Sequence, residues 1–382
     1  MKKVILIILL VLATALETTS CDYKPIENIP MVIGLAVDPI EDGYRLTAKV
    51  VIPAGSSNDG SISEEIFIQS SGKTMFDAVR DFIMKEGQKV FWGQLEFMVI
   101  NETIAEEDIT GVLDFFIRDN EVRENIWLLI SDKELKAEEV LMASFSEKKL
   151  QFYISDALKN IDYVSKYSTM SLIDFSKIYS DKGKEQVLPF IKIEISLGQK
   201  RIILNGGSVF KDNKAVGRLD GKEMQRYRML LGENAGIYVI DYKESGNESK
   251  ISLEIGDTKS KVRIQKKDGK YVITVQLSII GVIGEIEDNR VKISTKEKLE
   301  EFKKHAEIQL EEELAAFIIK IQKNFGSDIF GFGEKFKNKY PKVFKELEDN
   351  WNEVFSSLNI EVEVKVSITG TAQNKQPLYK ED

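Results

Sequence analysis

Two segments near the C-terminus constrain the fold of this 382-residue chain more than any others. In residues 299–325, apolar side chains recur every three or four positions, which predicts one long helix with a single buried stripe. In residues 360–368, Ile and Val alternate with Glu, Lys and Ser, which predicts a strand with one buried face. Helices and strands that each bury one side are typical of an α+β protein. The stripe consists of Leu299, Phe302, Ala306, Leu310, Leu314, Phe317, Ile321 and Phe325.

Capping residues predict where two of the helices begin and end. Thr74 can cap a helix that ends before Gly87, and its buried face is predicted to carry Phe76, Val79 and Ile83. Ser294 and Glu297 have the spacing of a capping box, which predicts that the long helix starts after Ser294.

The order of the predicted elements indicates an α+β, multi-domain protein with mainly antiparallel sheets packed with helices. Strands predominate to about residue 132, helices follow to residue 179, and strands return after Pro189. The later strands include two separate ones over 251–255 and 261–265, and Asp268-Gly269 predicts a hairpin. We predict an N-terminal α+β region over 22–200, with a split into two lobes left open. A C-terminal α+β domain over 201–370 and a disordered tail over 371–382 complete the chain.

Residues 1–20 have the pattern of a lipoprotein signal peptide. After Lys2-Lys3, the apolar run 4–16 would span roughly 20 Å as a helix, short of the roughly 30 Å hydrocarbon core of a bilayer. Small residues then precede Cys21, the only cysteine in the chain. We predict signal cleavage between Ser20 and Cys21 and lipid attachment to the Cys21 thiol. A plain secretory signal followed by an unmodified cysteine is the alternative.

Composition excludes several classes of function. One cysteine and one histidine, His305, exclude a disulfide within the chain, a cysteine zinc cluster and a multi-histidine metal site. The net charge of −9 gives no general attraction to nucleic acid, so no nucleic-acid partner is predicted. His305 is predicted to be a solvated residue on the polar side of the long helix.

Two glycine motifs resemble nucleotide sites but lack essential residues. Ser71-Gly72-Lys73-Thr74 ends like a phosphate loop, yet Phe67 stands where the first glycine is needed. Gly331-Phe332-Gly333 begins like a dinucleotide fingerprint, yet Phe336 replaces its third glycine. We therefore predict no catalytic residues, no cofactor and no metal.

Several segments, in order, resemble the Ger(x)C family, the C-subunit lipoproteins of spore germinant receptors. The resemblance covers nearly all of the mature chain. At Cys21 the chain departs from the family, because Asp22-Tyr23 follows where Trp-Asp is usual, and Thr18 stands where Leu is usual. The segments that carry the resemblance are 34–38 with the strand that follows, 91–95, 114–119, 207–223 and 326–366.

This resemblance implies an α+β fold in three domains and a non-enzymatic receptor subunit. It implies a lipid anchor on Cys21, in the lipid bilayer at the outer face of the spore inner membrane. It also implies two membrane-spanning partners, the A and B subunits, in a receptor that responds to nutrients. The identity of the nutrient and the partner-binding surface are not implied.

Two other functions are weighed against this one. A lipid-anchored solute-binding protein of a transporter would share the anchor, but its usual two doubly wound lobes do not suit the predicted strand order. A surface-anchored hydrolase would work through paired carboxylates, and a deep pocket with two close acids, one with a raised pKa, would support it.

Overall fold

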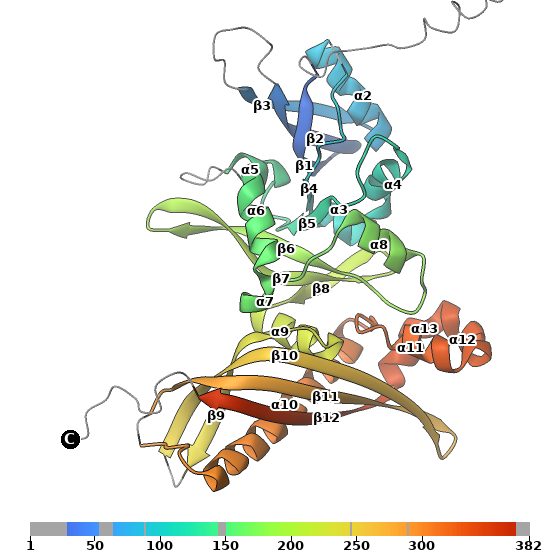
Figure 1. The fold of residues 1–382 in the computed structure, drawn as a ribbon. Coiled ribbons are helices and arrows are strands. Elements are labelled where there is room, and N and C mark those ends of the chain that lie inside the picture. Colours follow the sequence, from blue (N-terminus) through green and yellow to red (C-terminus); the bar gives the residue numbers. More distant parts are fainter. Residues whose placement is uncertain are drawn as a thin grey trace, which may run out of the picture.

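The structure is a computed structural model that describes residues 29–52, 64–87, 89–143, 150–244, 247–288 and 290–371. It contains an eight-stranded and a four-stranded sheet, both packed with helices (Figure 1). The predicted signal peptide 1–20, with Ser20, and the anchor Cys21 lie outside the described residues. So does the predicted tail, apart from Thr371 at the end of the last strand.

The eight-stranded sheet has the order β3-β2-β1-β4-β5-β6-β7-β8. Its four middle strands, β1, β4, β5 and β6, run parallel to one another, and antiparallel strands flank them on each side. The strands are β1 Met31–Ile40, β2 Gly43–Ile52, β3 Glu64–Gly72, β4 Phe97–Asn101, β5 Trp127–Ser131, β6 Val187–Ser196, β7 Gln199–Lys211 and β8 Lys214–Leu219.

Helices bury both faces of the middle strands. On β4, Met98 and Ile100 enter a core with α2, α4 and α8, whereas Phe97 and Val99 enter a second core with α5, α6 and α7. Such strands show no alternation in sequence because both of their faces are apolar. The helices of this region are α2 Met75–Glu86, α3 Glu102–Glu107, α4 Thr110–Arg118, α5 Ala137–Met142, α6 Leu150–Lys159, α7 Ile161–Val164 and α8 Leu172–Tyr179.

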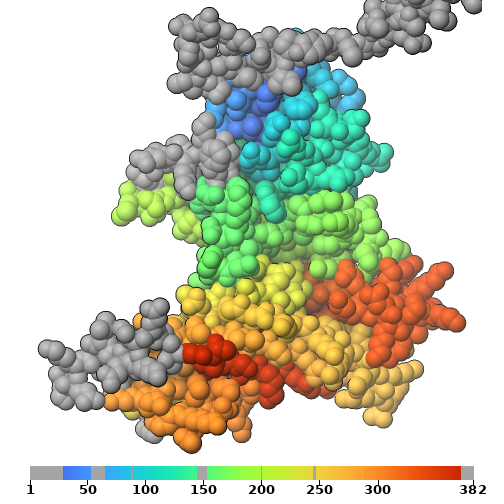
Figure 2. All heavy atoms as spheres, viewed as in Figure 1, coloured from blue at the N-terminus to red at the C-terminus, as the bar shows by residue number. Residues whose placement is uncertain are grey.

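The four-stranded sheet has the order β12-β11-β10-β9 and buries one face. On β12, Val364 and Val366 are buried and Glu363, Lys365 and Ser367 are exposed. Figure 2 shows this region, yellow to red, stacked below the blue and green large-sheet region. Its elements are α9 Gly221–Leu231, β9 Gly236–Glu244, β10 Asn247–Lys267, β11 Lys270–Ile286, α10 Lys296–Asn324, α11 Phe332–Lys339, α12 Pro341–Leu347, η2 Glu348–Asn350, α13 Trp351–Ser357 and β12 Asn359–Thr371.

The predicted fold class is confirmed: the chain is α+β and multi-domain, with antiparallel pairing at both sides of the large sheet and among β9, β10 and β11 of the small one. The last strand, β12, pairs parallel with β11. The parallel centre of the large sheet, with helices between its strands, differs from the predicted order of grouped elements. The predicted stripe of α10 is buried from Phe302 to Ile321, and the alternation of β12 is as predicted. No helix in the described ranges is both long enough and apolar enough to cross a bilayer.

Three local predictions are corrected by the structure. The buried face of α2 carries Met75, Ala78 and Phe82, whereas Phe76 is 55% exposed and its ring lies tilted against that of Phe115. The two strands predicted over 251–255 and 261–265 form one strand, β10, that continues through a bulge. The cap of α10 is Thr295, which accepts a hydrogen bond from the amide of Lys298, because the helix starts one residue later than predicted.

The predicted division between residues 200 and 201 falls within β7, which pairs with β6 on one side and β8 on the other. The large sheet therefore extends to Leu219. Val187, Val209 and Leu219 from these strands also join the core of the small-sheet region. The two regions thus share apolar contacts.

Candidate functional site

The large-sheet and small-sheet regions are joined by hydrogen bonds around the turn that follows α10. The amide of Glu185 donates to the carbonyl oxygen of Asp328 at 2.9 Å, and the amide of Glu334 donates to that of Gly183 at 3.1 Å. The hydroxyl of Ser327 donates to the carbonyl of Phe210 at 2.5 Å. The first two bonds connect the segment between α8 and β6 to the turn after α10 and the start of α11, and the third connects the end of β7 to the same turn.

The carboxylate of Asp328 organises this turn from a fully buried position. Its two oxygens accept hydrogen bonds from the amides of Gly331, Phe332 and Gly333 and, at 2.8 Å, from the indole nitrogen of Trp351. Burial raises the pKa of Asp328 to about 6, although the four hydrogen bonds act to lower it. A side chain at Gly333 would meet Trp351 Nε1 at 2.6 Å, so close packing here requires glycine.

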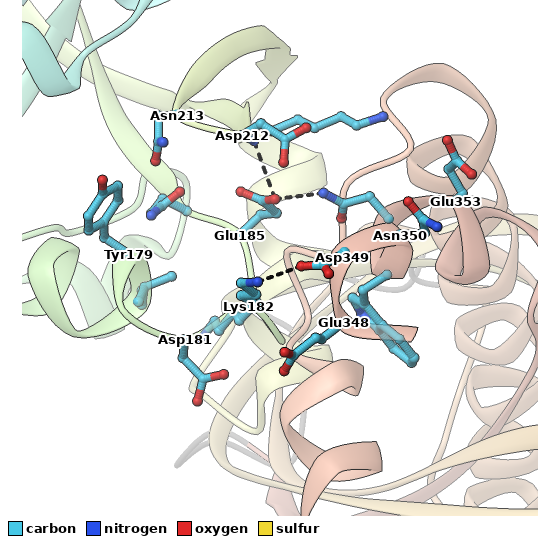
Figure 3. A pocket seen from close by; sticks show the side chains of 16 residues that line it. Tyr179, Asp181, Lys182, Glu185, Asp212, Asn213, Glu348, Asp349, Asn350 and Glu353 are labelled. Carbon is cyan, nitrogen blue, oxygen red and sulfur yellow. Dashed lines mark hydrogen bonds and ion pairs between the residues drawn. The ribbon is translucent and has the colours of Figure 1, made fainter. Parts of the chain in front are cut away.

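A cavity of about 350 Å³ lies beside this junction, with walls from both regions (Figure 3). One wall consists of the segment between α8 and β6 and the turn between β7 and β8. The other consists of η2 and the start of α13. The lining carries six carboxylates against three lysines. The acids are Asp181, Glu185, Asp212, Glu348, Asp349 and Glu353, and the lysines are Lys182, Lys184 and Lys211.

Glu185 lies at the centre of the cavity (Figure 3). Its Oε1 accepts hydrogen bonds from Asn352 Nδ2 at 2.7 Å and from the amide of Asp212 at 3.3 Å. Burial raises the pKa of Glu185, and the neighbouring carboxylates of Asp212 and Asp328 add to this effect. At the rim, Lys182 pairs with Asp349 at 2.5 Å, which joins the two walls directly.

A second polar cluster lies at the carboxyl ends of β4 and β5. Arg218 on β8 forms a bidentate contact with the buried Glu102 and donates to Asp132 at 2.9 Å. Its guanidinium also lies 4.1 Å from the centre of the Phe190 ring. All the charges in this cluster have partners, so it fits a role in holding β8 against α3.

The other candidate residues make structural contacts. His305 is half-buried: its Nε2 lies 2.7 Å from the Asp241 carbonyl and its ring packs edgewise on Tyr242, so the predicted solvated position is corrected. Thr74 caps α2, as predicted for the glycine motif that precedes it. Across the described ranges, no cluster of three or more His, Cys, Asp or Glu side chains could hold a metal.

The sequence analysis did not identify the residues at the junction. The sequence does carry a signal for Asp328, but none for Glu185. An aspartate followed by two glycines within five positions, as at Asp328, permits a turn whose amides converge on one carboxylate. Nothing local marks Glu185, because its partners Asp212 and Asn352 are remote in sequence.

Comparison with known proteins assigns the family. A model described as "Spore germination protein N-terminal domain" matches residues 22–193, and one described as "Spore germination B3/ GerAC like, C-terminal" matches residues 205–372. Together the matches cover nearly all of residues 22–372. The chain therefore belongs to the Ger(x)C family of spore germination proteins.

Full-length relatives and one solved structure agree with this assignment. Spore germination protein B3 of Bacillus subtilis is 24% identical, over 91% of this chain and 92% of its own. Spore germination protein KC of the same organism is 22% identical, over 100% of both chains. The crystal structure of the GerBC protein superimposes with a TM-score of 0.58 at 20% identity, covering 91% of this chain and 100% of that one, and so shares the fold.

Proposed function

We propose that this chain is a non-enzymatic, lipid-anchored subunit of a nutrient germinant receptor. It acts in the germination response together with two membrane-spanning partners, the A and B subunits. The observation that carries the proposal is the pair of family matches, in order, over residues 22–193 and 205–372. The long relatives named as spore germination proteins support it, since they match nearly end to end.

The proposed anchor is a lipid on Cys21, which would hold the chain at the outer face of the spore inner membrane. Two acyl chains give stable anchoring, where one is marginal. Ten positions separate Cys21 from the start of β1 at Met31, a span of at most roughly 35 Å. The large-sheet region would therefore lie close to the bilayer.

Labelling with a clickable palmitate analogue tests the anchor. The wild-type chain should incorporate the label, and Cys21→Ala should not, because the acceptor thiol is gone. Ser20→Ala keeps a small residue at the cleavage position and is the matched control that should remain labelled. Equal labelling of Cys21→Ala, or an unlabelled wild-type chain, would contradict the proposed anchor.

The receptor role is tested in spores. Deletion of the gene should abolish or strongly slow germination with the nutrients that its receptor answers, and the chain should co-purify with the A and B subunits. The strain should lack other members of the family, so that no relative replaces the missing subunit. Normal nutrient germination of such spores would contradict the receptor role.

The two alternatives gain less support from the molecule. The small sheet is mostly antiparallel and buries one face, unlike a lobe of a doubly wound solute-binding protein. For a hydrolase, the cavity offers one acid with a raised pKa, Glu185. Its neighbours Asp349 and Asp181 are paired with Lys182 and Lys337, which fits a structural role better than acid–base work.

A further inference from the structure

The hairpin between β6 and β7 carries apolar side chains out to its tip. Figure 1 shows this hairpin extending to one side of the molecule, beyond α5 and α6. Exposure rises at every second residue along it: Ile191 is fully buried, Ile193 is half-buried, Ile195 is 77% exposed and Leu197, in the turn, is 93% exposed. Leu197 lies six residues beyond Ile191, so roughly 20 Å of hairpin extends past the core.

The turn of this hairpin has an unfavourable residue for its backbone. Leu197 and Gly198 have φ angles of 52° and 76°, as in the two-residue type I′ turn. Two other hairpins in the described ranges show the same pair of positive φ angles, and both begin the turn with aspartate, in Asp212-Asn213 and Asp268-Gly269. Short polar side chains tolerate left-handed backbone, whereas leucine does so at a cost in stability. A leucine at this exposed position therefore points to a contact outside the chain.

Basic side chains flank the apolar tip. Residues 192–201 hold three cations and one anion, in a chain whose net charge is −9. Lys200 lies directly across from Ile195 in the register of the two strands, and its Nζ is 4.0 Å from the carboxylate of Glu139 on α5. The cations are Lys192, Lys200 and Arg201, and the anion is Glu194, which pairs with Lys192 at 2.5 Å. An apolar tip with net positive flanks suits a surface that is negatively charged outside and apolar within.

A bilayer with anionic lipids has both of these properties. Its surface potential attracts Lys and Arg side chains, and its hydrocarbon takes up aliphatic ones. A protein partner suits the tip less well, because a stable protein interface buries about 1,200 Å² or more and two side chains at a turn offer a small part of that area. The proposed lipid on Cys21 would bring a bilayer within reach, since at most roughly 35 Å of chain separates Cys21 from β1.

We propose that Ile195 and Leu197 insert into a bilayer that carries anionic lipids and form a second membrane contact beside the lipid on Cys21. Lys200 and Arg201 then lie at the level of the headgroups. Two contacts from different parts of the chain fix the orientation of the large sheet relative to the membrane, which one anchor cannot do. This inference deepens the proposed receptor role and rests on its membrane location.

The test uses the full lipidated chain, reconstituted in vesicles of equal parts phosphatidylglycerol and phosphatidylcholine. An environment-sensitive fluorophore on Ser196→Cys reports the position of the tip while Ile195 and Leu197 stay in place, and the wild-type chain treated alike gives the background from Cys21. The emission should shift to shorter wavelength and be quenched by spin-labelled lipid. The response should be smaller in vesicles of phosphatidylcholine alone, which lack the negative surface potential.

Two variants, each combined with the labelled Ser196→Cys, separate insertion from folding. Leu197→Asn places a residue that favours left-handed backbone in the turn, so its melting temperature should equal or exceed that of the parent chain. The ratio of inserted to free tips should nevertheless fall about tenfold or more, because the leucine no longer enters the hydrocarbon. Met84→Asn is the matched control: it removes an apolar side chain that is 84% exposed on α2 and should leave the ratio unchanged.

Flotation of the same samples with the vesicles reports the anchor separately from the tip. A shifted and quenched probe supports the insertion even if the chain fails to float, a result that would contradict the anchor alone. An unshifted probe overturns the insertion whether or not the chain floats, and so does an equal response in the Leu197→Asn variant. An equal response in phosphatidylcholine alone overturns the part of the anionic lipids. A shift that appears only on addition of the A and B subunits, without quenching by lipid, would assign the tip to a protein partner and overturn the bilayer contact.

Discussion

The two sheet regions bury apolar surface in different ways. The parallel strands at the centre of the large sheet are covered on both faces, so Phe97, Met98, Val99 and Ile100 are all buried in succession. In the small-sheet region, β12 alternates buried and exposed residues, and α10 packs on the buried side. The same types of residue thus alternate with polar residues in the small-sheet region and form a continuous apolar run in the large sheet.

This difference decides how each region responds to change. In the small-sheet region half of the strand positions face solvent and can vary freely. In the middle of the large sheet every position packs against a neighbour, so each substitution there is expected to lower the free energy of unfolding. The polar junction around Asp328 and Glu185 lies between these two kinds of core and depends on both.

The largest expected effect is at the junction. Asp328→Ala removes the acceptor of four buried donors, so the free energy of unfolding should fall by about 3–5 kcal/mol. Urea unfolding followed by tryptophan fluorescence measures the change. Asp349→Ala, whose side chain is 80% exposed, is the matched control and should lose less than about 1 kcal/mol. Similar losses for both variants would show that Asp328 is not the centre of the junction.

Neighbouring alanine substitutions test the contrast between the sheets directly. Met98→Ala and Val99→Ala on β4 should each cost about 2–3 kcal/mol, because the two side chains fill separate cores. On β12, Val364→Ala should cost about 2 kcal/mol and Lys365→Ala less than about 0.5 kcal/mol. Denaturant midpoints of the four variants provide the comparison. If Met98→Ala or Val99→Ala left the free energy of unfolding unchanged, one face of the large sheet would not be packed.

The stability of the junction should depend on pH. The pKa of Asp328 rises from an ordinary 3.8 to about 6 in the folded chain, so the folded state holds the proton more tightly. Its contribution is complete below pH 3.8 and is lost as the pH rises through 6. Between pH 7.5 and pH 5, acidification should therefore stabilise the fold by about 1.5 kcal/mol through this group.

Asp328→Asn isolates this contribution, because it cannot titrate while Glu185 and the other acids remain. Urea unfolding at the two pH values should show a smaller gain on acidification for the variant than for the wild type. An identical gain in both proteins would assign the pH dependence to other groups.

The smallest expected effect concerns the helix that covers the small sheet. Thr295→Ala removes the cap of α10 and should cost about 1 kcal/mol, because the amide of Lys298 loses its acceptor. Ser294→Ala is the matched control and should change stability by less than about 0.5 kcal/mol. Thermal unfolding of both variants shows which residue caps α10. A larger loss of stability for Ser294→Ala would support the predicted capping box instead of the Thr295 cap.

The sequence predicted the small-sheet region well because its signals are local and periodic. The stripe of α10, the alternation of β12 and the hairpin at Asp268-Gly269 each depend on residues that are close in the chain. In the large sheet the same reasoning placed six of the eight strands and missed β3 and β6. It also missed the parallel order of the middle strands, since strands without alternation carry no information about their neighbours. On α2 it chose Phe76 for the core, although the helix presents Phe82 there and leaves Phe76 at the surface.

By itself, the sequence determined the α+β class, the long helix, the final alternating strand and the resemblance to the Ger(x)C family; the lipid anchor at Cys21 stays a prediction. The tertiary structure alone decided that Glu185, Asp212 and Asn352 meet in one cavity. The physical reason is distance along the chain: a capping bond or an amphipathic stripe is complete within a few turns. A site built from segments more than a hundred residues apart exists only after both sheets have packed together.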